Sequence, residues 1–401
     1  DAGFLANLGT QNSGFFGGIL PVEAENGGVN IRSDPRGSGP YYISRYAPSV
    51  TIEFERNPGY FDKQQPFIDR IEAPIVTEYA ARLSQFRAGA IYTIPVNATD
   101  ILGTKRDIPD LNLVNADELA APATRALFGY KPGSGTPFRD ERVRQAFAHA
   151  LDRELYIDVI YGTAAFQDAG LPVETRLSSS TVPSSQDGWW LDPRSKDFGD
   201  NAKYFTFDLA EAKKLLSAAG YENGIEVDAA YEAAGDVRTF DVIIGMVQEA
   251  GIHLRPNPLE NRAEYSSVYS RGKGNYDGLA FGSATGGADP GNQLYAIYNS
   301  KGSVFPGFDI GGTGSFTGDP TIDDFTTRIR QEFDIDKRLE LAHELQRYEA
   351  KHQYSPFFPG GARGFSLYWP VIGNFGVYGG QTDSVERTWW IDDTEPPLLR
   401  S

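Results

Sequence analysis

Residues 136–162 read TPFRDERVRQAFAHALDRELYIDVIYG and carry the strongest structural signal in the sequence. Pro137 closes a turn, Asp140 can cap the first backbone donors of a helix, and Gly162 can supply a left-handed exit. The pattern therefore predicts one helix with a buried face. The apolar residues that recur at helical spacing are Val143, Phe147, Ala150, Leu151, Leu155 and Val159. The charged residues predicted to lie mostly on a solvated face are Arg142, Arg144, Asp152, Arg153 and Glu154.

The composition excludes several classes of protein. A chain of 401 residues exceeds the size that one hydrophobic core usually reaches, so two lobes are expected. A net charge of −17 disfavours nucleic acid and anionic membrane surfaces as partners, because both would repel the chain. The absence of cysteine excludes disulfides, thiolate catalysis and zinc–cysteine sites.

Short-range signals elsewhere predict strands alternating with helices, which is typical of an α/β protein. A hairpin is expected where aromatic and polar residues alternate on both sides of Pro48 and Ser49. Asp208 begins a capping box, and Gly220 ends the helix that follows. Further strands are expected at 68–76, 126–130 and 225–230, and further helices at 77–89, 240–250, 321–333 and 336–351. Irregular structure is expected at 163–207 and 299–320.

Four sequence motifs carry a resemblance to a known family. They are the Pro-Phe-x-Asp-x-Arg-Val-Arg run from Pro137, GSGPYYI at 37–43, ERNPGYF at 55–61 and DLAEAKKLLSAAGY at 208–221. Together they resemble the family 5 extracellular solute-binding proteins, the receptors of ABC importers for peptides, nickel and some oligosaccharides. Ser38 and Phe61 are mild departures from the family's threonine and tryptophan. The resemblance implies a two-lobed, periplasmic-binding-protein-like α/β fold of the large family 5 type.

The resemblance also implies how the chain is organised. Only 36 residues precede Gly37, where family members carry a small lobe, so an N-terminally truncated member is expected. The expected lobes are 1–125 for part of the first, 126–358 for the second, and 359–401 for the return to the first. A periplasmic or cell-surface monomer is implied, lipid-anchored through the missing N-terminus. Its expected partners are a small solute and an importer's membrane permease, with no nucleic acid, cofactor or metal.

The segment 276–290, YDGLAFGSATGGADP, aligns with the family segment that crosses the ligand cleft. Peptide-binding members place a tryptophan where this chain has Ser283 and an aspartate where it has Gly286, and some place an arginine where it has Ala280. A buried peptide terminus without its counter-charge is penalised by several kcal/mol, on the order of a broken buried ion pair. A neutral solute such as an oligosaccharide is therefore expected, with an oligopeptide or dipeptide as the alternative within the family.

Candidate ligand contacts are aromatic rings that can stack on a solute and polar groups that can hydrogen-bond to it. Each aromatic ring has a competing interpretation as a core or lobe-interface side chain. The candidates are Phe128, Tyr130, Trp189, Trp190, Phe281, Ser283, Thr285, Asn292 and Tyr295. Asp289, which precedes Pro290, is interpreted as a turn residue.

Two other classes of function remain open. A carbohydrate-active enzyme needs two acids that face each other across the sugar, and no such pair stands out in the sequence. The His-Glu-x-x-His and Gly-x-Ser-x-Gly motifs are also absent, so metalloprotease and serine-hydrolase interpretations lack their residues. A sensing domain built on the same fold is not distinguished from a transport receptor. A noncatalytic receptor is the function predicted here.

Overall fold

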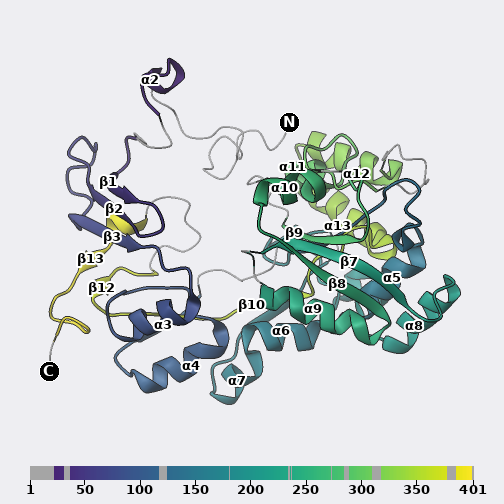
Figure 1. The fold of residues 1–401 in the computed structure, drawn as a ribbon, viewed down its shortest axis with the longest axis horizontal. Helices are drawn as coiled ribbons and strands as arrows, with labels where there is room; N and C mark the ends of the chain where they lie inside the picture. The colour runs from purple at the N-terminus through teal and green to yellow at the C-terminus, as the bar shows by residue number, and fades with distance from the viewer. Residues whose placement is uncertain are drawn as a thin grey trace. The chain divides into compact units, whose positions relative to one another are not determined.

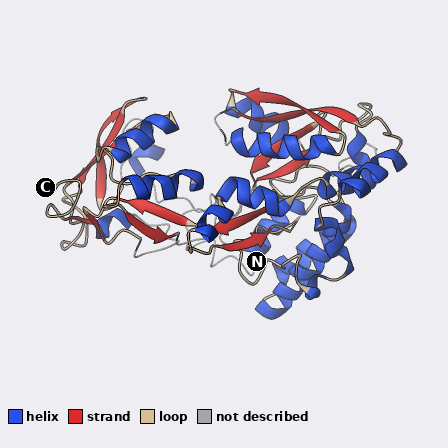
Figure 2. Cartoon of the chain, turned by 90° about the horizontal axis from the view of Figure 1, so that it is seen from below, coloured by secondary structure: helices blue, strands red, loops and turns tan. Residues whose placement is uncertain are grey.

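The computed structural model describes residues 22–30, 37–116, 124–179, 181–233, 235, 237–271, 273–283, 289–308, 318–376 and 385–399. These residues fall into two compact units, a larger one within 119–362 and a smaller one formed by 16–118 together with 363–401 (Figure 1). Each unit contains both helices and strands (Figure 2). The units are described separately below.

The larger unit is built on a mixed four-stranded sheet in the order β5-β9-β7-β8. Strand β5 is antiparallel to β9, whereas β9, β7 and β8 are mutually parallel. Its strands are β5 Thr124–Phe128, β6 Glu174–Leu177, β7 Ile225–Glu232, β8 Ile252–Leu259, β9 Leu279–Ser283 and β10 Gly360–Arg363. Its α-helices are α5 Glu141–His149, α6 Arg153–Tyr161, α7 Thr163–Asp168, α8 Leu209–Ala218, α9 Val237–Glu249, α10 Arg262–Tyr265, α11 Pro290–Tyr298, α12 Pro320–Gln331 and α13 Ile335–His352. The 3-10 helices η1 Pro137–Arg139, η2 Lys196–Phe198 and η3 Asp200–Phe205 and the π-helix η4 Ser266–Ser270 complete this unit.

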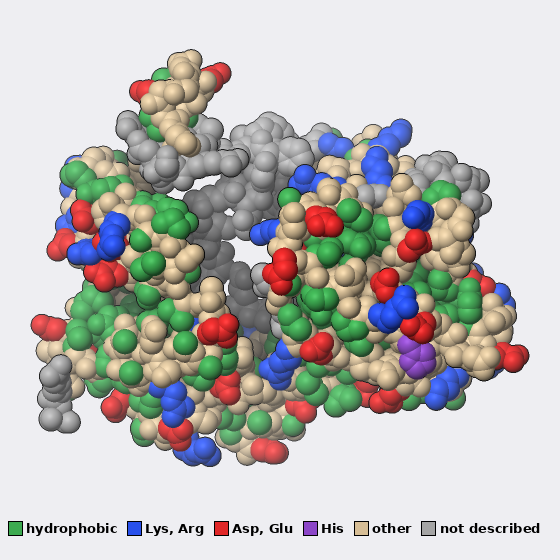
Figure 3. Space-filling view, in the orientation of Figure 1, with side chains coloured by type: hydrophobic (Ala, Val, Ile, Leu, Met, Phe, Trp, Pro, Cys, Tyr) green, Lys and Arg blue, Asp and Glu red, His purple; other side chains and the backbone are tan. Residues whose placement is uncertain are grey.

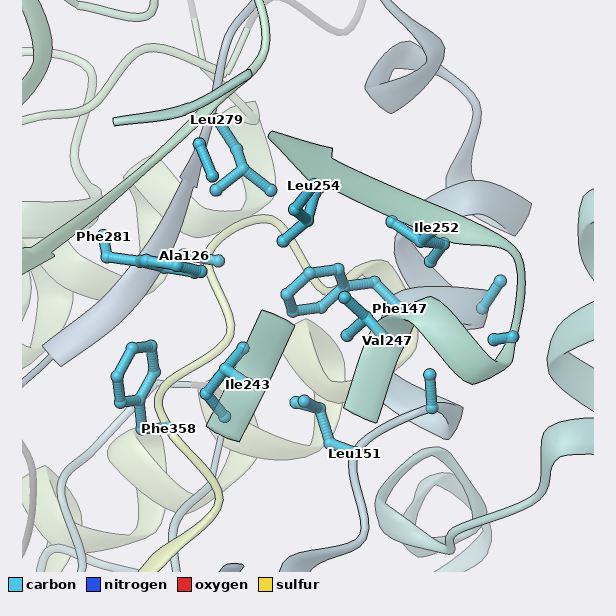
Figure 4. Packing of buried hydrophobic residues seen from close by; sticks show 14 of the residues in the cluster. Ala126, Phe147, Leu151, Ile243, Val247, Ile252, Leu254, Leu279, Phe281 and Phe358 are labelled. Carbon is cyan, nitrogen blue, oxygen red and sulfur yellow. The ribbon is translucent and has the colours of Figure 1, made fainter. Parts of the chain in front are cut away.

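One face of this sheet packs against helices and forms the main hydrophobic core. Side chains alternate between the two faces of a strand, so every second residue of β8 and β9 points inward. Figure 4 shows Phe147 from α5 and Val247 from α9 packed near Leu254, with Phe281 beside Phe358. Full burial of a side chain of this size stabilises the fold by about 1.5–3 kcal/mol. This core fixes the positions of β5 and β9, where the candidate site lies.

The opposite face of β7 and β8 is exposed to solvent over the first half of each strand, whereas Ala230 further along β7 is buried in a smaller hydrophobic cluster. Arg255 on β8 lies between two acids of β7, with ion-pair distances of 2.9 Å to Glu226 and 2.8 Å to Asp228. Figure 3 shows acidic and basic side chains interspersed on the visible face of this unit. Strand β8 forms an edge of the sheet and contains Pro256 and Pro258, neither of which has a backbone N–H to offer another strand.

The helix predicted across 136–162 is broken into two, so the prediction of one continuous helix is wrong. Asp140 caps α5, as expected, by accepting a hydrogen bond from the Arg142 N–H at 2.9 Å. A second cap then starts α6, where Asp152 accepts from the Leu155 N–H at 3.0 Å. Gly162 ends α6 with a φ of 62°, as predicted. The apolar spacing continues across the break, so periodicity alone does not reveal it.

Two arginines expected on a solvated face are buried instead. Arg153 occupies the break, where its Nη1 donates to the carbonyls of Ala148, Leu151 and Phe205 at 2.9–3.1 Å. Arg144 donates to the carbonyl of His352 at 2.8 Å and to carbonyls of η1. Helix ends leave carbonyls unsatisfied, and a buried guanidinium has enough donors to satisfy several of them. This use of arginine has no signature in the periodicity of one helix.

Other sequence-based predictions are mostly confirmed. The helix from Asp208 is α8, in which the Asp208 carboxylate accepts from the Glu211 N–H at 2.9 Å. The helices predicted at 240–250, 321–333 and 336–351 correspond to α9, α12 and α13, and the strand at 225–230 to β7. The stretch 163–207 is less irregular than predicted, because it contains α7, β6, η2 and η3. Most of 1–36 and residues 309–317 lie outside the described part of the chain.

The smaller unit contains the predicted hairpin. Strands β1 and β2 are antiparallel around a turn in which Ser49 has a φ of 60°, and β3 adds to β2. Trp369 packs edge-on against Phe86 and donates its indole N–H to the Phe86 carbonyl at 2.6 Å. The elements of this unit are α2 Val22–Glu25, β1 Tyr41–Ala47, β2 Thr51–Arg56, β3 Arg70–Pro74, α3 Tyr79–Arg87, α4 Ala98–Asp107, β4 Asn112–Asn115, β11 Phe365–Tyr368, β12 Ile372–Gly373, η5 Val385–Thr388 and β13 Trp390–Ile391.

Acid is expected to weaken the larger unit through His149, at the end of α5. Burial lowers the pKa of this imidazole, although the hydrogen bond between its Nδ1 and the Thr206 carbonyl opposes the shift. The unfolded chain therefore binds a proton more readily, so this part of the stability is present above about pH 6.5 and is lost as the pH falls. Urea unfolding between pH 7.5 and 5.5 is expected to show this loss, at no more than about 1.4 kcal/mol per pH unit for one proton. The dependence should become shallower in His149→Gln but not in His253→Gln, which changes an exposed histidine of β8. Equal slopes in wild type and His149→Gln would contradict this assignment.

Candidate ligand-binding site

The candidate site lies at the end of the larger unit's sheet where β5 begins and β9 ends. Because the two strands are antiparallel, the first residue of β5 pairs with the last residue of β9, which places Thr124 opposite Ser283. Their hydroxyl oxygens lie 3.4 Å apart. Ser283 is exposed and Thr124 is partly exposed. The sheet therefore ends in a pair of hydroxyl groups that a solute can reach.

The floor on one side of this hydroxyl pair is aromatic. Phe281, two residues before Ser283, stacks on Phe240 with ring centroids 5.3 Å apart and meets Phe358 edge-on at 5.4 Å. Only 2% of Phe281 is exposed. The ring thus supports the site from within the core, and its direct contact with a ligand stays a prediction.

Arg125 follows Thr124 in β5, so its side chain lies on the face of the sheet opposite the hydroxyl pair. It pairs with Gly282 across the sheet and is 3% exposed. Its guanidinium carbon lies 5.6 Å from the centre of the Tyr298 ring. Burial lowers the pKa of the Arg125 guanidinium, whereas the neighbouring Tyr298 and Glu349 oppose that shift. Burial also raises the pKa of the Tyr298 phenol. This end of the sheet therefore carries exposed hydroxyls on one face and a buried cation on the other.

Phe128 and Tyr130 lie deeper in the same unit. Phe128 stacks on Phe138 with ring centroids 4.3 Å apart, and Tyr130 donates its backbone N–H to the Gly274 carbonyl at 2.7 Å. Both side chains are at most 2% exposed. The structure gives them a packing role, and a ligand role for either stays a prediction.

The two predicted tryptophans belong to a second hydrophobic cluster, which includes residues of α11, α12 and α13. Trp189 is buried, with the Arg338 guanidinium 5.0 Å from its ring centre. Trp190 is half-buried and donates its indole N–H to the Leu177 carbonyl at 2.9 Å. These contacts hold the loop before η2 to the body of the unit. The structure does not bring the tryptophans into contact with Ser283.

Helix α11 carries two of the predicted ligand contacts, Asn292 and Tyr295. Asn292 is half-buried, and neither polar atom of its side-chain amide has a hydrogen-bond partner. The Tyr295 ring lies 4.5 Å from the Arg330 guanidinium carbon. Asp289, interpreted from the sequence as a turn residue, is the N-cap of α11, where its carboxylate accepts from the Asn292 N–H at 2.8 Å. Thr285, another predicted contact, lies outside the described residues, as does Gly286.

Sequence reasoning missed Thr124 and Arg125. The available signal was one arginine in the otherwise small or apolar run from 124 to 128. No group of three or more His, Cys, Asp or Glu side chains that could hold a metal ion occurs among the residues that the structure describes. In the same part of the chain, no helix has the length and apolar character needed to cross a bilayer.

Comparison with known proteins identifies the family to which the chain belongs. The family profile described as bacterial extracellular solute-binding proteins, family 5 Middle, matches residues 6–305. The chain therefore belongs to the family 5 bacterial extracellular solute-binding proteins. The membership confirms the resemblance predicted from the motifs.

Two relatives show how far the similarity extends. The dipeptide-binding protein of Pseudomonas aeruginosa is 26% identical over 360 residues, which cover 86% of this chain and 60% of that protein. Heme-binding protein A of Haemophilus influenzae is 26% identical over 311 residues, covering 75% of this chain and 51% of its own length. The chain thus spans less than two thirds of the length of these relatives.

Solved structures confirm the predicted fold class. The periplasmic binding protein DppA from Helicobacter pylori, in complex with the peptide STSA, matches with a TM-score of 0.72 at 21% identity, over 98% of this chain and 70% of that one. The binding protein AgaA from A. tumefaciens R10, in complex with agropinic acid, matches with a TM-score of 0.72 at 19% identity, over 97% of this chain and 74% of that one. At these identities the likeness establishes the fold.

Proposed function

We propose that this chain is a noncatalytic, extracytoplasmic receptor that captures a small solute of the peptide class and presents it to the permease of an ABC importer. Membership of family 5 supports receptor function. The names of the relatives support the peptide class, since one is a dipeptide-binding protein and a solved neighbour holds the peptide STSA. None of the relatives described above is named for a sugar. The peptide alternative is therefore better supported than the oligosaccharide expected from the cleft segment.

The observation that carries the proposal at the level of the site is the exposed hydroxyl pair of Thr124 and Ser283. Hydroxyls both donate and accept hydrogen bonds, so they can serve the amide groups of a peptide. The same pair argues against catalysis. The Ser283 hydroxyl has the Thr124 hydroxyl beside it, and no described histidine or carboxylate hydrogen-bonds to it. A serine needs such a base to become a nucleophile.

Thermal unfolding in the presence of candidate solutes tests the proposal. A solute that binds only the folded state stabilises it by about 2.7 kcal/mol at a concentration one hundred times its dissociation constant. We expect Ala-Ala or Ala-Ala-Ala to raise the melting temperature, and we expect maltotriose and Ni²⁺ to leave it unchanged. A shift with maltotriose alone would overturn the peptide assignment and restore the oligosaccharide.

A blocking substitution tests whether the solute binds at the Thr124–Ser283 hydroxyl pair. Ser283→Trp adds a large side chain at an exposed position and is expected to abolish the peptide-dependent shift. Ser217→Trp adds the same side chain at an exposed position of α8 and is expected to preserve the shift. Melting without peptide, recorded for both variants, shows whether each one folds. A full peptide response in a folded Ser283→Trp variant would place the ligand elsewhere.

A further inference from the structure

The tripeptide Glu-Asn-Gly occurs at 25–27 and again at 222–224. Asparagine followed by glycine deamidates spontaneously more readily than asparagine before other residues, because glycine has no side chain to shield its nitrogen and its backbone rotates freely. Asn26 and Asn223 are both exposed. The local sequence and the exposure of the side chain therefore do not distinguish the two positions, and a difference between them must come from the backbone around each glycine.

Deamidation requires the glycine nitrogen to reach the asparagine side chain. The nitrogen gives up its proton, attacks Cγ and forms a five-membered succinimide, while the side-chain amide leaves as ammonia with that proton. Water then opens the ring at one of its two carbonyls and leaves aspartate or isoaspartate. One water is consumed, one ammonia is released, and no oxidant takes part. A glycine whose nitrogen is held in place cannot make this attack until the surrounding structure opens.

Gly224 is held firmly where the chain enters β7. Its N–H donates to the Tyr221 carbonyl at 3.0 Å, and the N–H of the next residue, Ile225, donates to the Gly251 carbonyl at 2.9 Å. A Cβ atom at Gly224 would lie 2.3 Å from that same Gly251 oxygen, so the two backbones are in close contact. The side chains of Tyr221 and Ile225 pack in or against the main core. Moving the Gly224 nitrogen toward Asn223 therefore requires the first pair of β7 and β8 to open.

Gly27 is held loosely at the end of α2. Its N–H lies 3.4 Å from the Ala24 carbonyl, which is longer than an ordinary hydrogen bond, and no atom lies within 4 Å of the place that a Cβ at Gly27 would take. The Gly28 N–H closes the same turn by donating to the Glu23 carbonyl at 2.7 Å. Helix α2 has only four residues, none of them buried, and one isolated turn of helix is unstable by itself. Opening this single turn is enough to free the Gly27 nitrogen for attack on Asn26.

We infer that Asn26 is a deamidation site of the folded chain, whereas the fold protects Asn223. The reaction replaces a neutral amide by a carboxylate, so it makes the net charge of −17 more negative by one. Isoaspartate at this position also carries the main chain through the former side chain, which lengthens the backbone by one carbon and creates a substrate for an isoaspartyl methyltransferase. The inference involves no ligand, so it stands or fails independently of the proposed receptor function.

The main test follows both asparagines in one sample. The whole chain is incubated at mildly alkaline pH with and without urea, and its tryptic peptides are analysed for the gain of one mass unit, with fragment ions locating each change. In the folded chain, Asn26 is expected to react at least about tenfold faster than Asn223, because closed structure slows the reaction in proportion to the rarity of opening. In urea, where both turns are open, the two rates are expected to agree within about threefold.

Two matched variants give a second readout. Asn26→Gln is expected to abolish the early gain of isoaspartate, measured as methyl groups that an isoaspartyl methyltransferase transfers from S-adenosylmethionine. Asn223→Gln, the control, is expected to leave that signal unchanged. A folded chain in which Asn26 reacts no faster than Asn223 overturns the inference. A preference for Asn26 that persists undiminished in urea also overturns it, since the sequence rather than the fold would then set the two rates.

Discussion

Replacing Arg338 with methionine is expected to destabilise the larger unit by about 3–5 kcal/mol, the usual effect of removing one partner of a buried ion pair. Arg338 on α13 forms two hydrogen bonds to the Asp289 carboxylate, at 3.0 and 2.7 Å. Each side chain is 7% exposed, so water cannot replace the missing partner. The loss should be visible as a lower urea midpoint with an unchanged denaturant slope.

Two controls separate the buried pair from general effects of the substitution. Arg328→Met on α12 removes an arginine whose ion pair with Asp324 is more than half exposed, and it is expected to cost less than about 1 kcal/mol. Asp289→Asn removes the acid while keeping an oxygen that can cap α11. Added to Arg338→Met, it is expected to recover part of the stability, because no uncompensated charge is then buried. Similar losses in Arg338→Met and Arg328→Met would refute the importance of this pair.

Phe281→Ala is expected to lower the unfolding free energy by about 3–5 kcal/mol, since it removes a large ring from the centre of the core and leaves a cavity. The ring contacts Phe240 and Phe358 from two directions, so neighbours on α9 and beyond α13 would lose packing together. Phe333→Ala is the matched control, because that ring is 79% exposed and its removal should change stability by no more than about 0.5 kcal/mol.

The peptide affinity of the milder variant Phe281→Leu tests whether the Phe281 ring also contacts a ligand. Leucine keeps most of the buried volume, so the chain is expected to stay folded with peptide affinity unchanged within about threefold. A tenfold weaker affinity in a stably folded Phe281→Leu variant would show that the ring contacts the solute. A loss of less than 1 kcal/mol in Phe281→Ala would instead contradict the core position of the ring.

Much of the fold could be predicted because its signals are local. The cap at Asp208 and the exit at Gly162 depend on residues a few positions apart, and both occur as expected. The break between α5 and α6 could not be predicted in this way. It depends on Arg153 reaching the carbonyl of Phe205, 52 residues further along the chain, and such a contact leaves no trace in helical spacing.

The site was harder to predict, because strand pairing determines it. At the sequence level, Ala280 indicated that no arginine serves a ligand carboxylate. The strand pairing shows what an alignment of that one segment leaves out. Leu127 pairs with Ala280 and Arg125 with Gly282, so Arg125 lies on the same face of the sheet as Ala280, one strand away. Arg125 and Ala280 are 155 positions apart in the sequence, so only the strand register shows that they share a face.

The two prolines of β8 have a consequence for how the molecule behaves in a crowded compartment. A flat, open sheet edge can template the addition of strands from other molecules, which is how cross-β aggregates grow. With proline at 256 and 258, an incoming strand would find two of its carbonyls without a donor. This edge of the sheet is therefore a poor template for strand addition, which favours molecules that do not aggregate at high concentration.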